Sequence, residues 1–245
     1  MRTSAPLQKE RLNCSAALAL TTERSGRLFF KGVREADGEA VTALGREARI
    51  NATVQGVSPI VRHRFRIGGW SCLAFAHIAG RHADLGPGTD DLASVGSVLR
   101  RMQALSESAF PAPPLADRYV PYLLPGEAER LSGTGLLHTD TNPHNILISD
   151  GDGTAYVVDW ARAATGPAWV DPACTAVRLM ECGQAPADAL AWLDGFASWR
   201  TADPRSVEAF VSVTCRRWTA RVGERGAEQS NTRFRHLLSY PRESA

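Results

Sequence analysis

The chain has 245 residues, of which 44% are hydrophobic, and its 28 basic and 26 acidic side chains leave a net charge of +2. This apolar content can fill the core of one or two globular domains, and the balanced charge argues against nucleic acid or an anionic membrane surface as a partner. No apolar run is long enough for a secretion signal or a transmembrane helix, so we expect a cytoplasmic protein. The five cysteines form no CxxC pair and are odd in number, which argues against a disulfide framework and a zinc site.

The first 78 residues are predicted to form one domain of four strands and one helix. Short apolar stretches at 18–22 and 27–33 flank a polar turn, which indicates a hairpin. Residues 39–54 carry apolar side chains at helical spacing. Two further strands are expected at 61–67 and 72–78, on either side of a Gly-Gly turn. The predicted order is therefore strand, strand, helix, strand, strand.

The rest of the chain, residues 79–245, is predicted to be a second, mainly helical domain. A connector rich in Gly and Pro at 81–89 leads to a helix at 90–105, whose apolar residues recur at i, i+3, i+4 and i+7. The proline-rich stretch 111–125 is predicted to be a loop. A short helix, three short strands and a long helical region are then expected at 127–131, 136–138, 146–148, 155–158 and 186–240.

Two of those short strands bracket a loop of polar residues with the sequence HTDTNPHN. Its Asp140 and Asn145 have the spacing of the protein-kinase catalytic loop, in which the Asp receives the proton of the substrate hydroxyl and the Asn binds magnesium. A third residue, Asp159, ends the next apolar strand, where the same pattern has a metal-binding Asp. Each of these residue types alone is common in turns. The three at this spacing, between these strands, indicate a phosphoryl-transfer site with Mg²⁺.

The loop resembles that of the aminoglycoside phosphotransferase family and the related small-molecule kinases of the protein-kinase-like superfamily, which usually read His-Gly-Asp-x-x-x-x-Asn. Residues 161–173 are similar to the family's segment after the metal-binding Asp, in which a second Asp, here Asp171, braces the catalytic loop; we expect His138 to support the loop as well. The resemblance covers about residues 28–173. It implies an α+β, two-lobed fold with a small antiparallel sheet lobe and a larger helical lobe. It also implies ATP, with GTP as an alternative, as the phosphate donor.

A second pattern in the first domain involves Lys31 and Glu47. Lys31 alternates with Phe29 and Val33 along a strand and should point inward, where a buried ammonium group needs a partner. Glu47 follows Leu44 by three residues and lies on the inward stripe of the predicted helix. The resemblance implies that Lys31 contacts the nucleotide phosphates and pairs with Glu47.

Further nucleotide-binding groups are expected at two places. The backbone at Ala76 and Ile78, between the domains, would contact the adenine. The hairpin at 12–17 would cover the phosphates, with Ser15 supplying an N–H group and a hydroxyl. This hairpin has no glycine, unlike the G-x-G-x-x-G loop of protein kinases. A nucleotide-binding pseudokinase acting as a regulatory or scaffold module is therefore the main alternative. A third interpretation, a metal hydrolase, would use His138, Asp140, His144 and Asp159.

The acceptor should be a hydroxylated small molecule, either an antibiotic or a metabolite. From Asp171 to the end, nine acidic residues stand against ten arginines, whereas a polycationic aminoglycoside calls for an acidic surplus. We therefore expect a neutral or less cationic acceptor. Trp160 and Trp169, close in sequence to Asp159, are the candidates for contacting it. The sequence patterns specify no oligomeric state.

Overall fold

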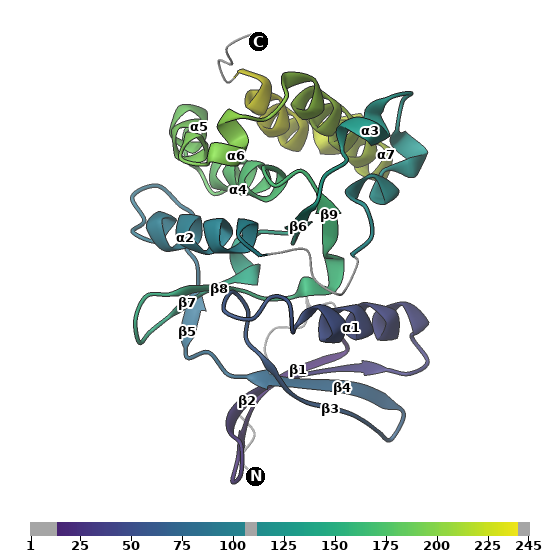
Figure 1. Ribbon diagram of the computed structural model, residues 1–245, viewed down its shortest axis with the longest axis vertical. Coiled ribbons are helices and arrows are strands. Elements are labelled where there is room, and N and C mark those ends of the chain that lie inside the picture. The colour runs from purple at the N-terminus through teal and green to yellow at the C-terminus, as the bar shows by residue number, and fades with distance from the viewer. Residues whose placement is uncertain (1–13, 106–111, 240–245) are drawn as a thin grey trace.

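The computed structural model describes residues 14–105 and 112–239. In its N-terminal part, four antiparallel strands form a sheet in the order β1-β2-β4-β3, and helix α1 (Gly38–Ile50) packs against it (Figure 1). The strands are β1 (Ala16–Thr22), β2 (Gly26–Arg34), β3 (Val61–Ile67) and β4 (Trp70–Ala76). The predicted order of two strands, a helix and two strands is confirmed.

Helix α1 is shorter than the sequence predicts. Asp37 caps its first turn with a 3.0 Å hydrogen bond from a backbone N–H, and the helix ends at Ile50 rather than at residue 54. Asn51 explains this early end. Its side-chain amide donates to the Pro59 carbonyl at 2.8 Å, and its Oδ1 accepts the Val61 N–H at 2.7 Å. These two bonds connect the end of the helix to the start of β3.

The C-terminal part combines two small sheets with a group of helices (Figure 1). One sheet has the order β5-β7-β8, and the other pairs β6 with β9. The strands are β5 (Gly80–His82), β6 (Gly135–Leu137), β7 (Ile146–Ser149), β8 (Ala155–Val157) and β9 (Ala164–Gly166). The helices are α2 (Leu92–Gln103), α3 (Glu127–Arg130), α4 (Val170–Glu181), α5 (Pro186–Asp194), α6 (Ala197–Arg200) and α7 (Pro204–His236). The short 3₁₀ helices are η2 (Leu115–Arg118), η3 (Val120–Tyr122), η4 (Pro143–Asn145), η5 (Trp160–Arg162) and η6 (Leu237–Ser239).

Several elements differ from the sequence prediction. Strand β4 ends at Ala76, two residues earlier than predicted, and β5 begins one residue before the predicted connector 81–89 and extends into it. The described part of the predicted loop, 112–125, contains η2 and η3, and β9 was not predicted. Strands of three residues are too short to show an alternating pattern in the sequence. Within residues 14–105 and 112–239, no helix has the length and apolar character needed to cross a membrane.

The buried apolar side chains form two clusters of unequal size. The smaller cluster lies between α1 and the sheet and contains Val33, Leu44, Leu73 and Phe75. The larger cluster fills the C-terminal part, but it also includes Ile50, Val54 and Val57 from the end of α1 and the turn after it. The Val157 N–H of β8 donates to the Val57 carbonyl at 2.7 Å. The N-terminal sheet and the helical part are therefore joined through this turn.

Candidate active site

The hairpin formed by β7 and β8 places Asn145 beside Asp159. Asn145 directly precedes β7, and Asp159 comes two residues after β8. Ile146 and Val157 are paired across the hairpin, and the Val158 N–H donates to the Asn145 carbonyl at 2.9 Å. Because the strands are antiparallel, both predicted magnesium ligands lie at the same end of the hairpin.

His138 and Asp171 hold the backbone of the predicted catalytic loop. The buried Asp171 carboxylate accepts the N–H groups of His138 and Thr139, at 2.7 and 2.8 Å. Burial raises the pKa of Asp171, although His138 and the two N–H donors oppose that effect. The His138 Nε2 donates to the Val158 carbonyl at 2.9 Å, and its Nδ1 accepts the Asp140 N–H at 3.3 Å, which assigns the proton to Nε2. Both residues thus contact the loop that they were expected to support.

The Asp140 carboxylate is partly exposed, and the side chains of Asn142 and Arg178 lie beside it. Asn142 Nδ2 donates to its Oδ1 at 2.9 Å, and Arg178 Nη2 lies 4.0 Å from the same oxygen. Asn145 Nδ2 donates to the Asp140 carbonyl at 2.9 Å, which leaves the amide oxygen of Asn145 as an acceptor. The carboxylate that the sequence predicts as the base is therefore oriented by neighbours and still accessible.

Lys31 connects the N-terminal sheet to the end of the hairpin. Its Nζ donates to both Glu47 carboxylate oxygens, at 2.9 and 3.1 Å, and to Asp159 Oδ1 at 3.1 Å. The Lys31 and Glu47 side chains are each 6% exposed, so the predicted ion pair is present and buried. Burial alone would lower the pKa of Lys31, but the two carboxylates outweigh it and raise this pKa above its usual value. The ammonium group is therefore charged at neutral pH.

The other predicted nucleotide-binding residues take no part in these side-chain contacts. Ala76 ends β4, and its N–H donates to the Ile60 carbonyl at 2.9 Å. Ile78 is half-buried in the short segment between β4 and β5, and Ser15 is exposed just before β1. Residues 12 and 13 of the predicted phosphate-covering hairpin lie outside the described residues. The roles of Ser15, Ala76 and Ile78 stay predictions.

The oxygen atoms of Asn145 and Asp159 are of the kind that magnesium binds. An amide oxygen and a carboxylate are hard ligands, and nucleotide phosphates and water can complete the octahedron. In the described part of the chain, no three His, Cys, Asp or Glu side chains are grouped to hold a metal ion. His138 is fully buried with both ring nitrogens bonded inside the loop, and the exposed His144 packs edge-on against His82. These contacts disfavour the metal-hydrolase interpretation.

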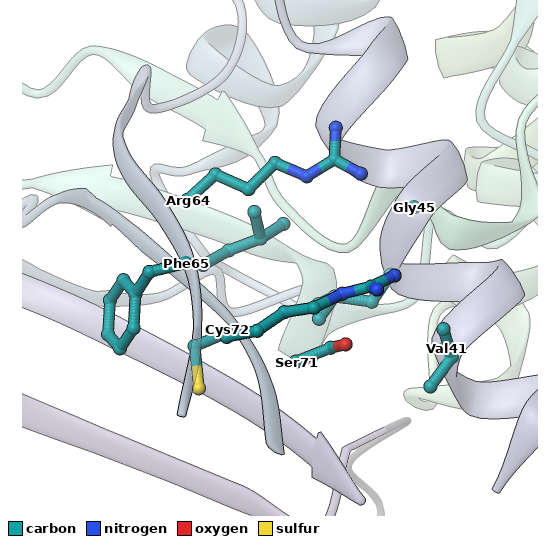
Figure 2. Close-up of a pocket in the computed structure, with 9 residues that line it drawn as sticks. Val41, Gly45, Arg64, Phe65, Ser71 and Cys72 are labelled. Carbon is teal, nitrogen blue, oxygen red and sulfur yellow. The ribbon is translucent and has the colours of Figure 1, made fainter. Parts of the chain in front are cut away.

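A separate pocket of about 280 Å³ lies between α1 and the β3–β4 hairpin. Figure 2 shows Arg64 reaching from β3 towards α1, with Val41 and Gly45 on the helix that faces it. None of the predicted site residues lines this pocket. It is therefore not the candidate active site.

The prediction that Trp160 and Trp169 contact an acceptor is wrong. Trp160 is 1% exposed and Trp169 is 5% exposed. Trp160 packs edge-on against the His138 ring with the centroids 4.9 Å apart, and Trp169 packs against Trp199 and Phe210. Both indoles are packed into the core and almost fully buried.

Two neighbours of Asp140 were missed in the sequence, although local patterns point to them. Arg178 follows Asp171 by seven residues, or two turns of α4, so helical spacing places it on the same face as the residue that braces the loop. Asn142 precedes Pro143, a typical start of a helical turn, and its Oδ1 accepts the His144 N–H at 2.9 Å.

A sequence model described as the phosphotransferase enzyme family matches residues 15–210. A comparison with curated proteins gives no match. Choline kinase LicA from Streptococcus pneumoniae is 12% identical, with a TM-score of 0.60 over 98% of this chain and 95% of that chain. A choline/ethanolamine kinase family protein from Mesorhizobium loti is 18% identical, with a TM-score of 0.57 over 97% and 89% of the two chains. Macrolide 2'-phosphotransferase MphH from Brachybacterium faecium is 17% identical, with a TM-score of 0.51 over 99% and 93%. These similarities confirm the α+β, two-lobed protein-kinase-like fold expected from the sequence.

Proposed function

Because the chain belongs to the phosphotransferase enzyme family, we propose that it transfers the terminal phosphoryl group of ATP to a hydroxyl group of a small molecule. The observation that carries this proposal is the buried contact of Lys31 with Glu47 and Asp159, at the hairpin end that also holds Asn145. Phosphoryl transfer requires mainly that the phosphates be positioned and their charge neutralised. A fixed cation beside two oxygen ligands for magnesium meets both needs.

The nucleotide would lie between the two lobes. Lys31, oriented by Glu47, would contact its phosphates, and Asn145 and Asp159 would hold the magnesium ion. The bound ion would supply further neutralisation of the phosphate oxygens.

The base of the nucleotide would rest on the segment between β4 and β5. The backbone at Ala76 and Ile78 would bind the adenine, which makes this segment the hinge and places the lobes at residues 1–78 and 79–245. Ser15 would face the phosphates from the hairpin before β1. GTP stays an alternative donor, because backbone groups at a hinge can bind either base.

Asp140 would accept the proton of the acceptor hydroxyl. As that proton leaves, the hydroxyl oxygen bonds to the γ-phosphorus, and the bond from the γ-phosphorus to the bridging oxygen breaks. The products are a phosphate ester and ADP. The Asn142 amide, 2.9 Å from Asp140 Oδ1, keeps the carboxylate turned in one direction.

The surroundings of Asp140 favour a neutral acceptor, or one that is not strongly cationic. Arg178 brings a guanidinium group to within 4.0 Å of the carboxylate, and a cationic acceptor would have to approach that charge. The balance of nine acids and ten arginines after residue 170 points the same way. An antibiotic such as a macrolide carries less positive charge than an aminoglycoside and fits this site better.

The decisive experiment measures magnesium-dependent ATP consumption with a panel of hydroxylated metabolites and antibiotics. We expect turnover with at least one acceptor and a loss of about a hundredfold or more in Asp140→Asn. The amide in this variant keeps the shape of the side chain but cannot take up a proton. Equal turnover by the wild type and Asp140→Asn would contradict the role of Asp140.

The glycine-free hairpin at 12–17 favours one other candidate, a nucleotide-binding pseudokinase. Thermal-shift titration separates the two functions. An enzyme should be stabilised by ATP only when magnesium is present. Stabilisation by ATP without the metal, or none in either case, would favour the pseudokinase.

A further inference from the structure

Thr139, directly before Asp140, has an unusual backbone conformation. Its φ angle is 66°, and in the described residues Asp159 is the one other non-glycine position with a positive φ. In this region the Cβ atom crowds the backbone, and a β-branched side chain is especially disfavoured. Such a conformation persists only where the surroundings hold it.

Three hydrogen bonds hold Thr139 in place. Its N–H donates to Asp171 Oδ1 at 2.8 Å. Its hydroxyl donates to the Arg162 carbonyl at 2.9 Å and accepts a hydrogen bond from Arg118 Nη1. Because the hydroxyl acts as donor and acceptor at once, the side chain is fixed in one orientation.

Arg118 reaches the loop from η2, a separate part of the chain. Its Nη2 donates to the Ala163 carbonyl at 3.4 Å, four residues after Asp159. Burial, together with the neighbouring Arg162, lowers the pKa of Arg118 to about 10. Placing a guanidinium group against uncharged oxygens in a partly buried site is unfavourable. The side chain nevertheless contacts both the catalytic loop and the segment that follows Asp159.

We propose that Arg118 is a positioning residue, which holds Thr139 in the left-handed conformation and thereby fixes Asp140 relative to Asp159. The inference rests on the proposed function of Asp140. A glycine adopts positive φ without strain. A chain with glycine at position 139 would therefore not depend on Arg118.

The test compares four proteins: the wild type, Arg118→Met, Thr139→Gly and the double variant. The kcat and KM for ATP are measured in magnesium-dependent ATP hydrolysis, with water as the acceptor. Arg118→Met should lower kcat by about tenfold to a hundredfold, with KM for ATP changed by less than about twofold. In the Thr139→Gly background, the same substitution should lower kcat by less than about threefold.

An equal loss of kcat in both backgrounds, no loss, or a change in KM alone would overturn the proposal. If Arg118→Met does not fold but the double variant does, glycine has replaced the function of Arg118, as expected. If neither folds, Arg118 acts on something other than Thr139 and the proposal fails. Arg162→Met is the matched control: it removes the neighbouring charge and keeps the backbone carbonyl, so kcat should stay within about twofold. If Arg162→Met lowered kcat as much as Arg118→Met does, the effect would come from the loss of local positive charge and not from the contact with Thr139. This result would overturn the proposal.

Unfolding measurements separate this inference from the proposed function. A wild type that never turns over ATP would contradict the phosphotransferase proposal. The midpoints of urea unfolding of the same four proteins would then test whether Arg118 holds Thr139 in its conformation. The fall in midpoint caused by Arg118→Met should be at least halved when residue 139 is glycine. An equal fall in both backgrounds would overturn the role of Arg118.

Discussion

Three hydrogen bonds of the candidate site converge on the Lys31 ammonium group. Of the 28 basic residues in the chain, only Lys9 and Lys31 are lysines. The Lys31 ammonium group is close to two carboxylates at once, Glu47 and Asp159, in a buried position. An ammonium group is compact, whereas the planar fork of a guanidinium demands more space. This explains why an arginine-rich chain keeps a lysine here.

Lys31→Met is expected to lower the free energy of unfolding by about 3–5 kcal/mol, because the carboxylates lose a buried cation. It should also abolish the stabilisation by magnesium ATP. Adding Glu47→Leu removes one uncompensated charge, so the double variant should regain part of the unfolding free energy without regaining the response to ATP. Urea denaturation and thermal-shift titration measure the two effects. A double variant that responds to ATP would contradict the role given to Lys31.

Arg178 offers a test of acceptor charge. Arg178→Glu reverses the charge 4.0 Å from Asp140. The kcat/KM of cationic acceptors should therefore rise relative to that of neutral acceptors. We expect the ratio of kcat/KM for choline to that for 3,3-dimethyl-1-butanol, its neutral isostere, to rise by about tenfold, or ~1.4 kcal/mol. Arg178→Gln should give a smaller rise. An unchanged ratio would show that Arg178 does not face the acceptor.

At the residue scale, the sequence predicted contacts that depend on local spacing. Asp140 and Asn145 stand at a recognisable spacing. Strand and helix periodicity predicted that Lys31 and Glu47 point inward, and the family resemblance implied that they pair. Their roles in binding and catalysis stay predictions. Trp160 was misjudged because closeness to Asp159 in the sequence says nothing about exposure. The contact between Arg118 and Thr139 depends on tertiary packing, which no local pattern encodes.

Among the elements, the β7–β8 hairpin and α4 do most to position the site. The hairpin brings the segments around Asn145 and Asp159 together, and α4 carries Asp171 and Arg178 on one face. The sequence predicted the strands of the hairpin and the start of α1, because their apolar patterns are regular. It missed the early end of α1, which depends on hydrogen bonds from Asn51 to the chain that follows.

Asp91 links β5 to α2 and gives an element-scale prediction. Its carboxylate accepts two hydrogen bonds from Arg81, at 2.5 and 2.7 Å, and the Asp84 N–H at 2.8 Å. The Arg81 hydrogen bonds lower the pKa of Asp91 below its usual value. The stability that Asp91 contributes is therefore present above the unfolded-state pKa and is lost as the pH falls through the lower folded-state pKa. Because Arg81 is largely exposed, Asp91→Asn should cost only about 1–2 kcal/mol at pH 7.

The same variant predicts a pH dependence. The difference in unfolding free energy between the wild type and Asp91→Asn should shrink between about pH 4 and pH 2, as the wild-type carboxylate becomes protonated. Urea denaturation at pH 7 and at pH 2.5 measures this difference. A difference that stays constant over this range would mean that Asp91 contributes through packing and not through its charge.

For the whole molecule, the two-lobed protein-kinase-like fold was expected from the resemblance and is confirmed. The sequence did not predict that one core would include residues of both lobes, because apolar periodicity marks a buried face but does not say which element covers it. The C-terminal end of α1 and the following turn pack with the helical lobe. Arg101 of α2 strengthens this junction by donating to the carbonyls of Gly56 and Ala155. The lobe boundary near residue 78 stays a prediction.

Arg101→Met should lower the unfolding free energy by about 1–3 kcal/mol, because two carbonyls lose a charged donor. It should also reduce the thermal shift produced by magnesium ATP, since the turn anchors the helix that carries Glu47. Arg100→Met is the matched control on the same helix, because Arg100 contacts Gly195 and Phe196 within the helical lobe. The control should leave the nucleotide response unchanged. A similar loss of response in both variants would contradict the anchoring role of Arg101.

The shared core also constrains how the protein is made on the ribosome. Val57 leaves the ribosome about a hundred residues before Val157, its partner in β8, which at ordinary translation rates corresponds to roughly 5–20 s. During that interval the nascent chain exposes the apolar end of α1, and Lys31 has Glu47 beside it but not Asp159. The end of α1 therefore stays uncovered until the helical lobe has emerged, although the sheet has a small core of its own. Translation pauses or truncations before residue 160 should therefore expose an aggregation-prone surface, and the active site should be among the last parts of the molecule to form.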